Sequence, residues 1–233
     1  MDGEKGFCQD VTRRAFISRT ALMTLVTLGG LGSAAREICW GQSGSSNKAK
    51  LREKYRGLSR QELLDKTYAQ GAAYESISGS CSQCTAAALH EFLEIDDAVV
   101  RAANSSCGGQ AVTVLGTCGG VIGGTMVLDY FLGRPVEAMS SEPSKKPDRE
   151  KLRYAIGTAR LLCDRFDQEY GSILCPAIQR KLFGRTYYLP DPDEFQKFLK
   201  AGGHSDPTKC MRVVGNASKW TMEILLDKGV VEM

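Results

Sequence analysis

The chain has 233 residues, of which 42% are hydrophobic and 24% charged, a balance typical of a folded globular protein and not of a disordered or fibrous one. Lys and Arg together number 30 against 27 Asp and Glu, and these charges are interleaved along the chain, so the composition excludes an obvious nucleic-acid-binding surface. Nine cysteines against two histidines indicate chemistry that depends on sulfur rather than on imidazole.

The N-terminal segment resembles a twin-arginine export signal. Arg13 and Arg14 precede a weakly apolar stretch, 20–32, which is followed by small residues at 33–35. In a helix the apolar stretch would span only about two-thirds of a hydrocarbon core roughly 30 Å thick, so it is too short for a permanent anchor. We therefore expect residues 1–35 to be a signal peptide that is removed, leaving an exported, periplasmic protein with no membrane span.

The rest of the chain predicts one compact all-α domain. The Gly- and Ser-rich composition after the signal predicts a flexible tether over 36–58, and the folded domain is expected over 59–233. Helical spacing and capping residues predict helices at 60–77, 84–93, 96–103, 121–132, 148–170, 175–183, 191–201 and 209–227. No sustained alternation of apolar and polar residues predicts a β-strand.

Two groups of cysteines lie where helices are predicted to begin. Cys81 and Cys84 form a CxxC motif, and Cys118 stands between glycines just before another helix. Unpaired backbone N–H groups at a helix start favour a thiolate, and glycines allow the backbone to approach a neighbouring group closely. By itself the CxxC motif also fits two buried residues or a structural disulfide. Together, the thiols at two helix starts predict a shared site.

With these motifs the chain resembles the family of redox-active proteins that is named for its C, GCAxxG, C, C cysteine pattern. The resemblance covers roughly 67–228, and its matching segments are Cys84 with 85–89, Cys118 with 119–123, 170–175 ending in Cys175, and Lys209-Cys210. Gly120 stands where the pattern usually has alanine. A similar domain occurs beside the haems of split-Soret cytochromes c.

This resemblance implies a helical domain in which Cys84, Cys118, Cys175 and Cys210 converge, either as redox thiols or as ligands of an iron–sulfur cluster. Cys81 and Cys107 lie outside the pattern and are candidates for additional redox thiols, whereas Cys39 and Cys163 have no predicted role. The chain has no CxxCH motif, so no c-type haem is expected.

The favoured hypothesis is therefore an exported protein that binds an iron–sulfur cluster through four cysteines and transfers electrons. Four thiolates also suit a zinc ion, and the long spacings between the cysteines do not identify the metal. One alternative is thiol–disulfide chemistry by Cys81 and Cys84, and another is a structural module stabilised by disulfides or zinc. The expected partners are a redox protein and, as a homodimer, a second copy of the chain. No catalytic residue is predicted.

Overall fold

The computed structural model describes residues 48–142 and 144–233, so the predicted signal peptide and the first part of the tether lie outside the described residues. Within these ranges the chain is helical and has no named β-strand, which confirms the all-α prediction. The elements are η1 (Glu53–Tyr55), α2 (Arg60–Ser78), α3 (Cys81–Phe92), α4 (Asp97–Ala102), α5 (Gly119–Leu132), η2 (Val136–Ala138), α6 (Arg149–Tyr170), α7 (Cys175–Phe183), α8 (Pro192–Lys200) and α9 (Cys210–Asp227). None of these helices is long and apolar enough to cross a membrane.

Four of the helices, α2, α4, α6 and α8, begin at capping residues that the sequence provides. Ser59 and Glu62 form the predicted capping box at the start of α2, in which each side chain receives a hydrogen bond from the backbone N–H of the other residue. Asp96, Asp148 and Asp191 accept hydrogen bonds from backbone N–H groups in the first turns of α4, α6 and α8. These caps explain why the observed helix limits lie close to the predicted ones.

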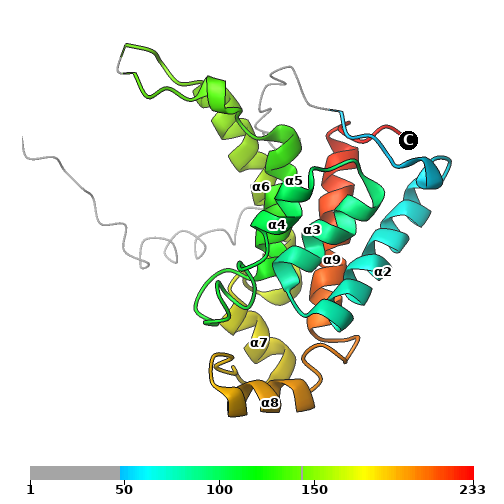
Figure 1. Ribbon diagram of the computed structural model, residues 1–233, viewed down its shortest axis with the longest axis vertical. Helices are drawn as coiled ribbons and strands as arrows, with labels where there is room; N and C mark the ends of the chain where they lie inside the picture. The colour runs from blue at the N-terminus through cyan, green and yellow to red at the C-terminus, as the bar shows by residue number, and fades with distance from the viewer. Residues whose placement is uncertain (1–47, 143) are drawn as a thin grey trace, which may run out of the picture. The chain divides into compact units, whose positions relative to one another are not determined.

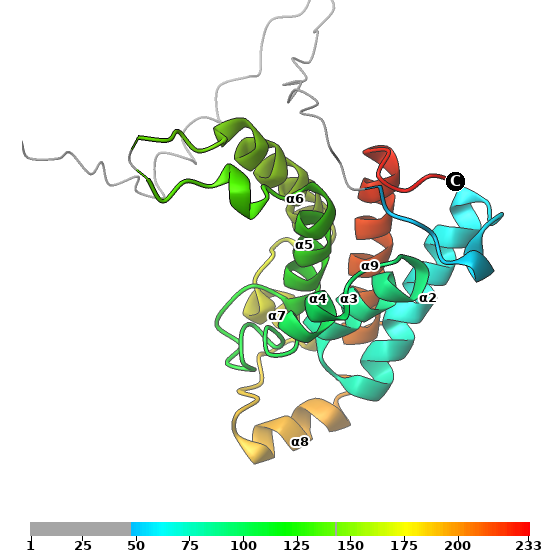
Figure 2. The same cartoon turned by 45° about the horizontal axis from the view of Figure 1, so that its top comes forward.

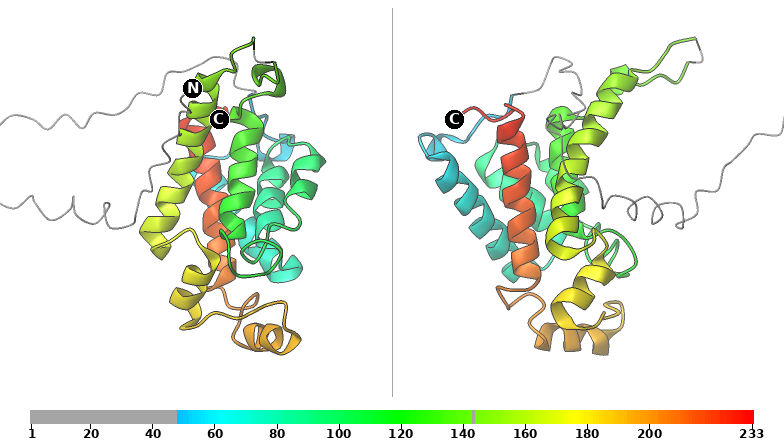
Figure 3. Two further views of the ribbon diagram at one scale, coloured as in Figure 1. Left: turned by 90° about the vertical axis from the view of Figure 1, so that its left-hand side faces the viewer. Right: turned by 180° about the vertical axis from the view of Figure 1, so that it is seen from behind.

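Helix α9 is the centre of the fold. It packs against α2, α3, α5 and α6, and it lies between α2 and the α5–α6 pair in Figures 1 and 3. Its inward face includes Val214, Ala217, Met222 and Leu225, which are completely buried. Burial of such side chains is the main source of stability for a helix of this kind.

Close packing of α5 against its neighbours depends on glycine. A Cβ atom at Gly123 would overlap the carbonyl oxygen of Ser82 in α3, and one at Gly124 would overlap the hydroxyl of Thr221 in α9. The small face that the sequence presents here therefore allows α5 to contact two helices at backbone distance.

Residues 48–58, the last part of the predicted flexible tether, pack on the domain, so the prediction is wrong for this segment. Ala49 pairs with Val231 and Leu51 pairs with Leu93 in isolated β-bridges, and the two tether side chains are buried. The Gly- and Ser-rich composition ends before residue 48, so the predicted flexible tether should not have included residues 48–58. The alternation of charged and apolar residues over 48–52 fits a short extended segment with one buried face.

We expect Leu51→Ala to lower the free energy of unfolding by about 2 kcal/mol, because it removes a buried side chain from the contact between this segment and α3. Urea denaturation followed by circular dichroism measures the effect. Leu115→Ala is the matched control, since Leu115 is 80% exposed and should change stability by no more than about 0.5 kcal/mol. Equal effects of the two substitutions would contradict the packing of the segment.

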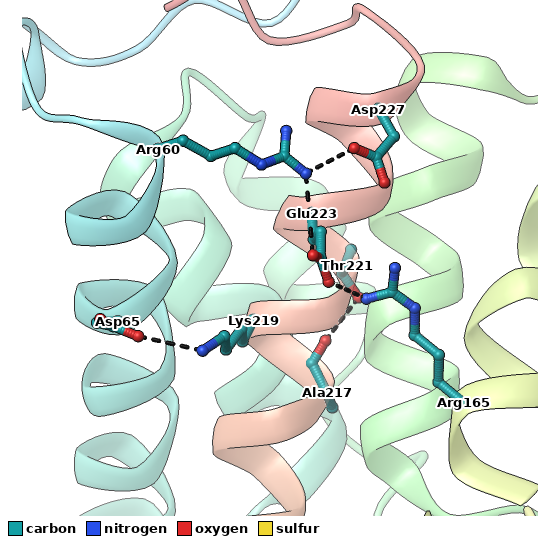
Figure 4. A network of polar contacts seen from close by, with 8 residues as sticks. All are labelled: Arg60, Asp65, Arg165, Ala217, Lys219, Thr221, Glu223 and Asp227. Carbon is teal, nitrogen blue, oxygen red and sulfur yellow. Dashed lines mark hydrogen bonds and ion pairs between the residues drawn. The ribbon is translucent and has the colours of Figure 1, made fainter. Parts of the chain in front are cut away.

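On the outer face of the bundle, ion pairs connect α9 with α2 and α6 (Figure 4). Arg60 Nη2 lies 2.6 Å from Asp227 Oδ1, Lys219 Nζ lies 3.1 Å from Asp65 Oδ1, and Arg165 pairs with Glu223. Pairs this exposed contribute at most about 1 kcal/mol each, so they help to orient the helices but do not hold the fold together.

Helices α7 and α8 cover one end of the bundle, the end at which α9 begins (Figures 1 and 2). An aromatic cluster joins them: Phe198 of α8 is completely enclosed and lies 5.5 Å from Phe183 and 5.8 Å from Tyr187, measured between ring centroids. The space between this end of the bundle and the two covering helices contains the candidate site.

Candidate functional site

Four cysteines each stand at the N-terminus of a different helix. Cys81, Cys175 and Cys210 are the first residues of α3, α7 and α9, and Cys118 directly precedes α5. A helix N-terminus presents unpaired N–H groups and the positive end of the helix dipole, and both stabilise a thiolate. All four line one cavity of about 440 Å³, together with Cys107 from the loop between α4 and α5.

Backbone pairing fixes the starts of α5 and α7 side by side. Thr117 and Leu174 form an antiparallel β-bridge. Beside it the N–H of Cys118 donates to the carbonyl of Ile173 at 2.8 Å, and the N–H of Cys175 donates to the carbonyl of Gly116 at 2.9 Å. Two cysteines that are far apart in the sequence are thus held together by main-chain hydrogen bonds and not by chance contacts of side chains.

The thiol of Cys81 lies against the start of α5, beside Cys118. The neighbouring Cys118 thiol, followed by desolvation, raises the pKa of Cys81 well above its ordinary value. The backbone N–H of Gly108 also donates to Cys81 Sγ at 3.4 Å. Gly119 makes this approach possible, because a Cβ at that position would overlap Cys81 Sγ. The close approach predicted for the glycines around Cys118 is therefore present.

The loop that carries Cys107 has an unusual backbone. Gln110, Ala111, Val112 and Val114 all have positive φ angles, between 47° and 72°, which is rare for residues other than glycine. The loop's own hydrogen bonds hold it in place, including Val112 N–H to the Cys107 carbonyl at 3.0 Å. Such concentrated strain is typical of functional sites.

Gly109 of this loop is a position at which we expect substitution to lower the stability of the fold. Its φ is 71°, and a Cβ placed there would lie 2.9 Å from Cys175 Cβ. We expect Gly109→Ala to cost about 2 kcal/mol of stability, because it combines an unfavourable backbone angle with a contact that displaces Cys175. Gly171→Ala is the matched control, because Gly171 has a φ of 75° but no heavy atom within 4 Å of its Cβ position.

Chemical denaturation of both variants measures the difference, and the alkylation rate of Cys175 reports on the displacement. The control should lose only the backbone contribution of about 1 kcal/mol and should leave Cys175 unaffected. Equal losses in the two variants would show that Gly109 is needed for its backbone angle alone.

The structure does not place Cys84 with the other predicted ligands. Cys84 lies one helical turn further along α3 than Cys81, is 2% exposed and does not line the cavity. Burial, followed by the negative charge of Glu75, raises the pKa of the Cys84 thiol to about 12. Cys163 is also separate, in a groove between α5 and α6. The residue that joins Cys118, Cys175 and Cys210 is therefore Cys81.

The site thiols are in a weakly solvated environment. Burial and then the charges of Cys81 and Cys107 raise the pKa of Cys175 to about 12. Desolvation and the charge of Glu75 raise the pKa of Cys210 well above its ordinary value. Lys209, the nearest cation along the chain, donates to the Ala201 carbonyl and lies 4.9 Å from the centroid of the Phe183 ring. Burial therefore favours the protonated, weakly nucleophilic form of Cys175 and Cys210.

A carboxylate–histidine pair also faces the cavity. His204 Nδ1 lies 3.0 Å from Glu75 Oε1, and both residues line the cavity beside the thiols. Burial raises the pKa of Glu75, and the hydrogen bond with His204 opposes that rise. Sequence patterns gave no sign of this pair, because its members are 129 residues apart in the chain.

The thiols around the cavity do not converge on one point as the ligands of a single metal ion would. Within the described residues, no three or more His, Cys, Asp or Glu side chains form a group that could hold one metal ion. A tetrahedral zinc site would need four sulfurs about 2.3 Å from one point. Instead, thiols from four helices surround a cavity, and the seven cysteines of the described ranges are all free thiols. These four thiols are the residues that could serve as ligands if a metal group is bound here.

These features define a class: within the described residues, an all-helical protein with five cysteines gathered around one cavity. A family model described as "Putative redox-active protein (C_GCAxxG_C_C)" matches residues 80–224, and the chain belongs to this family. The match begins directly before Cys81 and includes the five cysteines that line the cavity. Searches of curated proteins and of solved structures found no match.

Proposed function

We propose that this redox protein holds an iron–sulfur cluster through Cys81, Cys118, Cys175 and Cys210 and exchanges electrons with a partner protein. The observation that carries the proposal is that four thiols, each at the N-terminus of a different helix, line one cavity. When bound, the cluster supplies one-electron redox chemistry.

The surrounding residues suit this role. Four helix N-termini direct their positive ends toward the thiolates, and the Gly108 N–H already donates to Cys81 Sγ. Ile178, Val213 and Val214 line the same cavity with apolar surface, which limits the access of water and oxidants. The charge of the metal would also offset the cost of ionising thiols in so weakly solvated a site.

Export is a further part of the proposal. The twin-arginine pattern at Arg13-Arg14 lies outside the described residues and is supported by the sequence alone. This route carries folded proteins, so a cluster assembled in the cytoplasm would reach the periplasm inside a closed site. We expect the mature protein in the periplasmic fraction, and Arg13→Lys together with Arg14→Lys should retain it in the cytoplasm.

The experiment for the cluster is anaerobic purification of the full chain, followed by iron, zinc and acid-labile sulfide analysis and a visible spectrum. Matched iron and sulfide with broad absorption near about 400 nm are expected. Protein that stays colourless after anaerobic reconstitution with iron and sulfide would overturn the proposal. One zinc per chain would instead favour a structural role.

Cys81 Sγ lies against Gly119, the residue directly after Cys118, and this proximity supports a second candidate, thiol–disulfide exchange. Here the reacting pair is Cys81 and Cys118, and not the Cys81 and Cys84 of the CxxC motif. The two thiols would lose two electrons and two protons as their S–S bond forms, and a disulfide substrate would gain both and become two thiols. Mass spectrometry of metal-free, oxidised protein tests this candidate, which requires a peptide linked through Cys81 and Cys118.

A further inference from the structure

The groove between α5 and α6 is a second open surface, separate from the thiol cavity. It has a volume of about 1010 Å³, and α6 lies on the side of the bundle opposite α2 (Figures 1 and 3). The wall from α5 includes Thr125 and Asp129. The wall from α6 carries an apolar stripe at helical spacing, formed by Leu152, Ile156, Ala159 and Cys163. Because Ile156 is 59% exposed and Leu152 is 37% exposed, this stripe is available to a partner.

The charges beside the apolar stripe are divided between the two halves of α6. Arg149 and Arg153 lie in the first two turns, whereas Asp164 and Asp167 lie in the last two, and all four are exposed. At about 100° per residue they fall on the same flank of the stripe. The helix dipole favours the opposite arrangement, with anions near the N-terminus and cations near the C-terminus. This charge pattern therefore does not serve the stability of α6 itself.

The same charges find little compensation within their own chain. Arg149, Arg153 and Asp167 make no ion pair with another described residue, and Asp164 Oδ1 lies 3.8 Å from the nearest cationic nitrogen, on the same helix. By contrast, Arg165 and Glu169 of α6 pair with residues of α9. The exposed flank thus keeps its charges available for a partner whose charges run in the opposite direction.

We propose that a second copy of the chain docks on this surface, with the two α6 helices packed antiparallel. The midpoint of the stripe lies between Ile156 and Ala159, so a two-fold axis there sets the stripe of one copy against the same stripe of the other. Antiparallel packing also brings the basic end of each α6 to the acidic end of its partner. Arg149 and Asp167 lie at similar distances on either side of the midpoint, as do Arg153 and Asp164, so each pair can meet across the axis.

This surface goes beyond the proposed function, and dimerisation does not depend on whether the thiols hold a cluster. Sedimentation equilibrium of the full chain, with a thiol reductant present, should show a dimer with a Kd of about 10 µM or lower. Ile156→Asp places a charge in the middle of the stripe and should raise the Kd by about a hundredfold or more. Leu161→Asp is the matched control, because Leu161 is 41% exposed but lies on the opposite side of α6. It should leave the Kd within about threefold of the wild-type value, and circular dichroism of both variants should match the wild type.

Reversal of the flanking charges tests the antiparallel orientation. Arg149→Glu alone and Asp167→Lys alone should each raise the Kd by about tenfold, because the two-fold axis brings like charges together twice in each dimer. An equimolar mixture of the two variants should recover the wild-type affinity, since both contacts in the mixed dimer again join opposite charges. Both positions are exposed, so neither change should disturb the fold.

Three outcomes would overturn the inference. A wild-type chain that stays monomeric at about 100 µM would assign the groove to another occupant, either a different protein or part of residues 1–47. Equal effects of Ile156→Asp and Leu161→Asp would show that the apolar stripe is not the interface. Failure of the mixed charge variants to recover the affinity would exclude the antiparallel contact. Dimerisation of colourless, metal-free protein would uphold the inference even where the cluster proposal fails.

Discussion

Cys81→Ser is expected to abolish the visible absorption and the bound iron, whereas Cys84→Ser is expected to retain both. The two residues belong to one CxxC motif, but only Cys81 lines the cavity with Cys118, Cys175 and Cys210. A serine hydroxyl is a poor substitute for a thiolate on iron, so the loss of one ligand should remove most of the cluster. Iron and sulfide analysis after anaerobic reconstitution measures the difference.

The controls separate loss of a ligand from loss of the fold. Cys163→Ser changes a thiol in the separate α5–α6 groove and should leave the absorption unchanged. Circular dichroism of Cys81→Ser should match that of the wild-type protein before reconstitution. If Cys84→Ser loses the cluster and Cys81→Ser keeps it, the ligand set derived from the cavity is wrong and the one implied by sequence resemblance is right.

Gly123→Val should lower the free energy of unfolding by about 3 kcal/mol or more. This loss should exceed that of Leu51→Ala and that of Gly109→Ala. A Cβ at this position would overlap the carbonyl oxygen of Ser82, and a backbone atom inside α3 cannot move aside as a flexible side chain can. The new side chain would therefore force α3 and α5 apart along their whole contact. Urea denaturation followed by circular dichroism measures the loss.

Thr125→Val introduces the same side chain into the same helix and serves as the control. Thr125 is half-buried and faces the α5–α6 groove, so its replacement should cost less than about 1 kcal/mol. Gly123→Ala should fall between the two, since it adds only the overlapping Cβ. A stability of Gly123→Val close to that of Thr125→Val would contradict the close contact of α3 with α5.

Local signals were sufficient to predict the helices. Each capping acid or serine satisfies N–H groups within its own first turn, so Ser59 and Asp148 mark a helix start whatever the rest of the fold does. The packing of the 48–58 segment is not predictable from its own composition, because it depends on pairing with Leu93 and Val231, which are distant in the sequence. Local composition carries no information about such partners.

The same limit applied to the site. The positions of Cys118, Cys175 and Cys210 at helix starts could be predicted, and the structure brings them to one cavity. The choice between Cys81 and Cys84 depends on which one faces the starts of α5 and α9, and this follows from the packing of three helices. The partnership of Glu75 with His204 likewise exists only in the folded chain.

The distribution of the four thiols along the chain has a consequence for biogenesis. They lie at the starts of α3, α5, α7 and α9, and the first and last are Cys81 and Cys210. A fragment of the domain therefore contains all four thiols only if it includes residues 81–210. Assembly of the proposed cluster would therefore require a nearly complete chain, and a truncated polypeptide that lacks α9 would be unable to hold it.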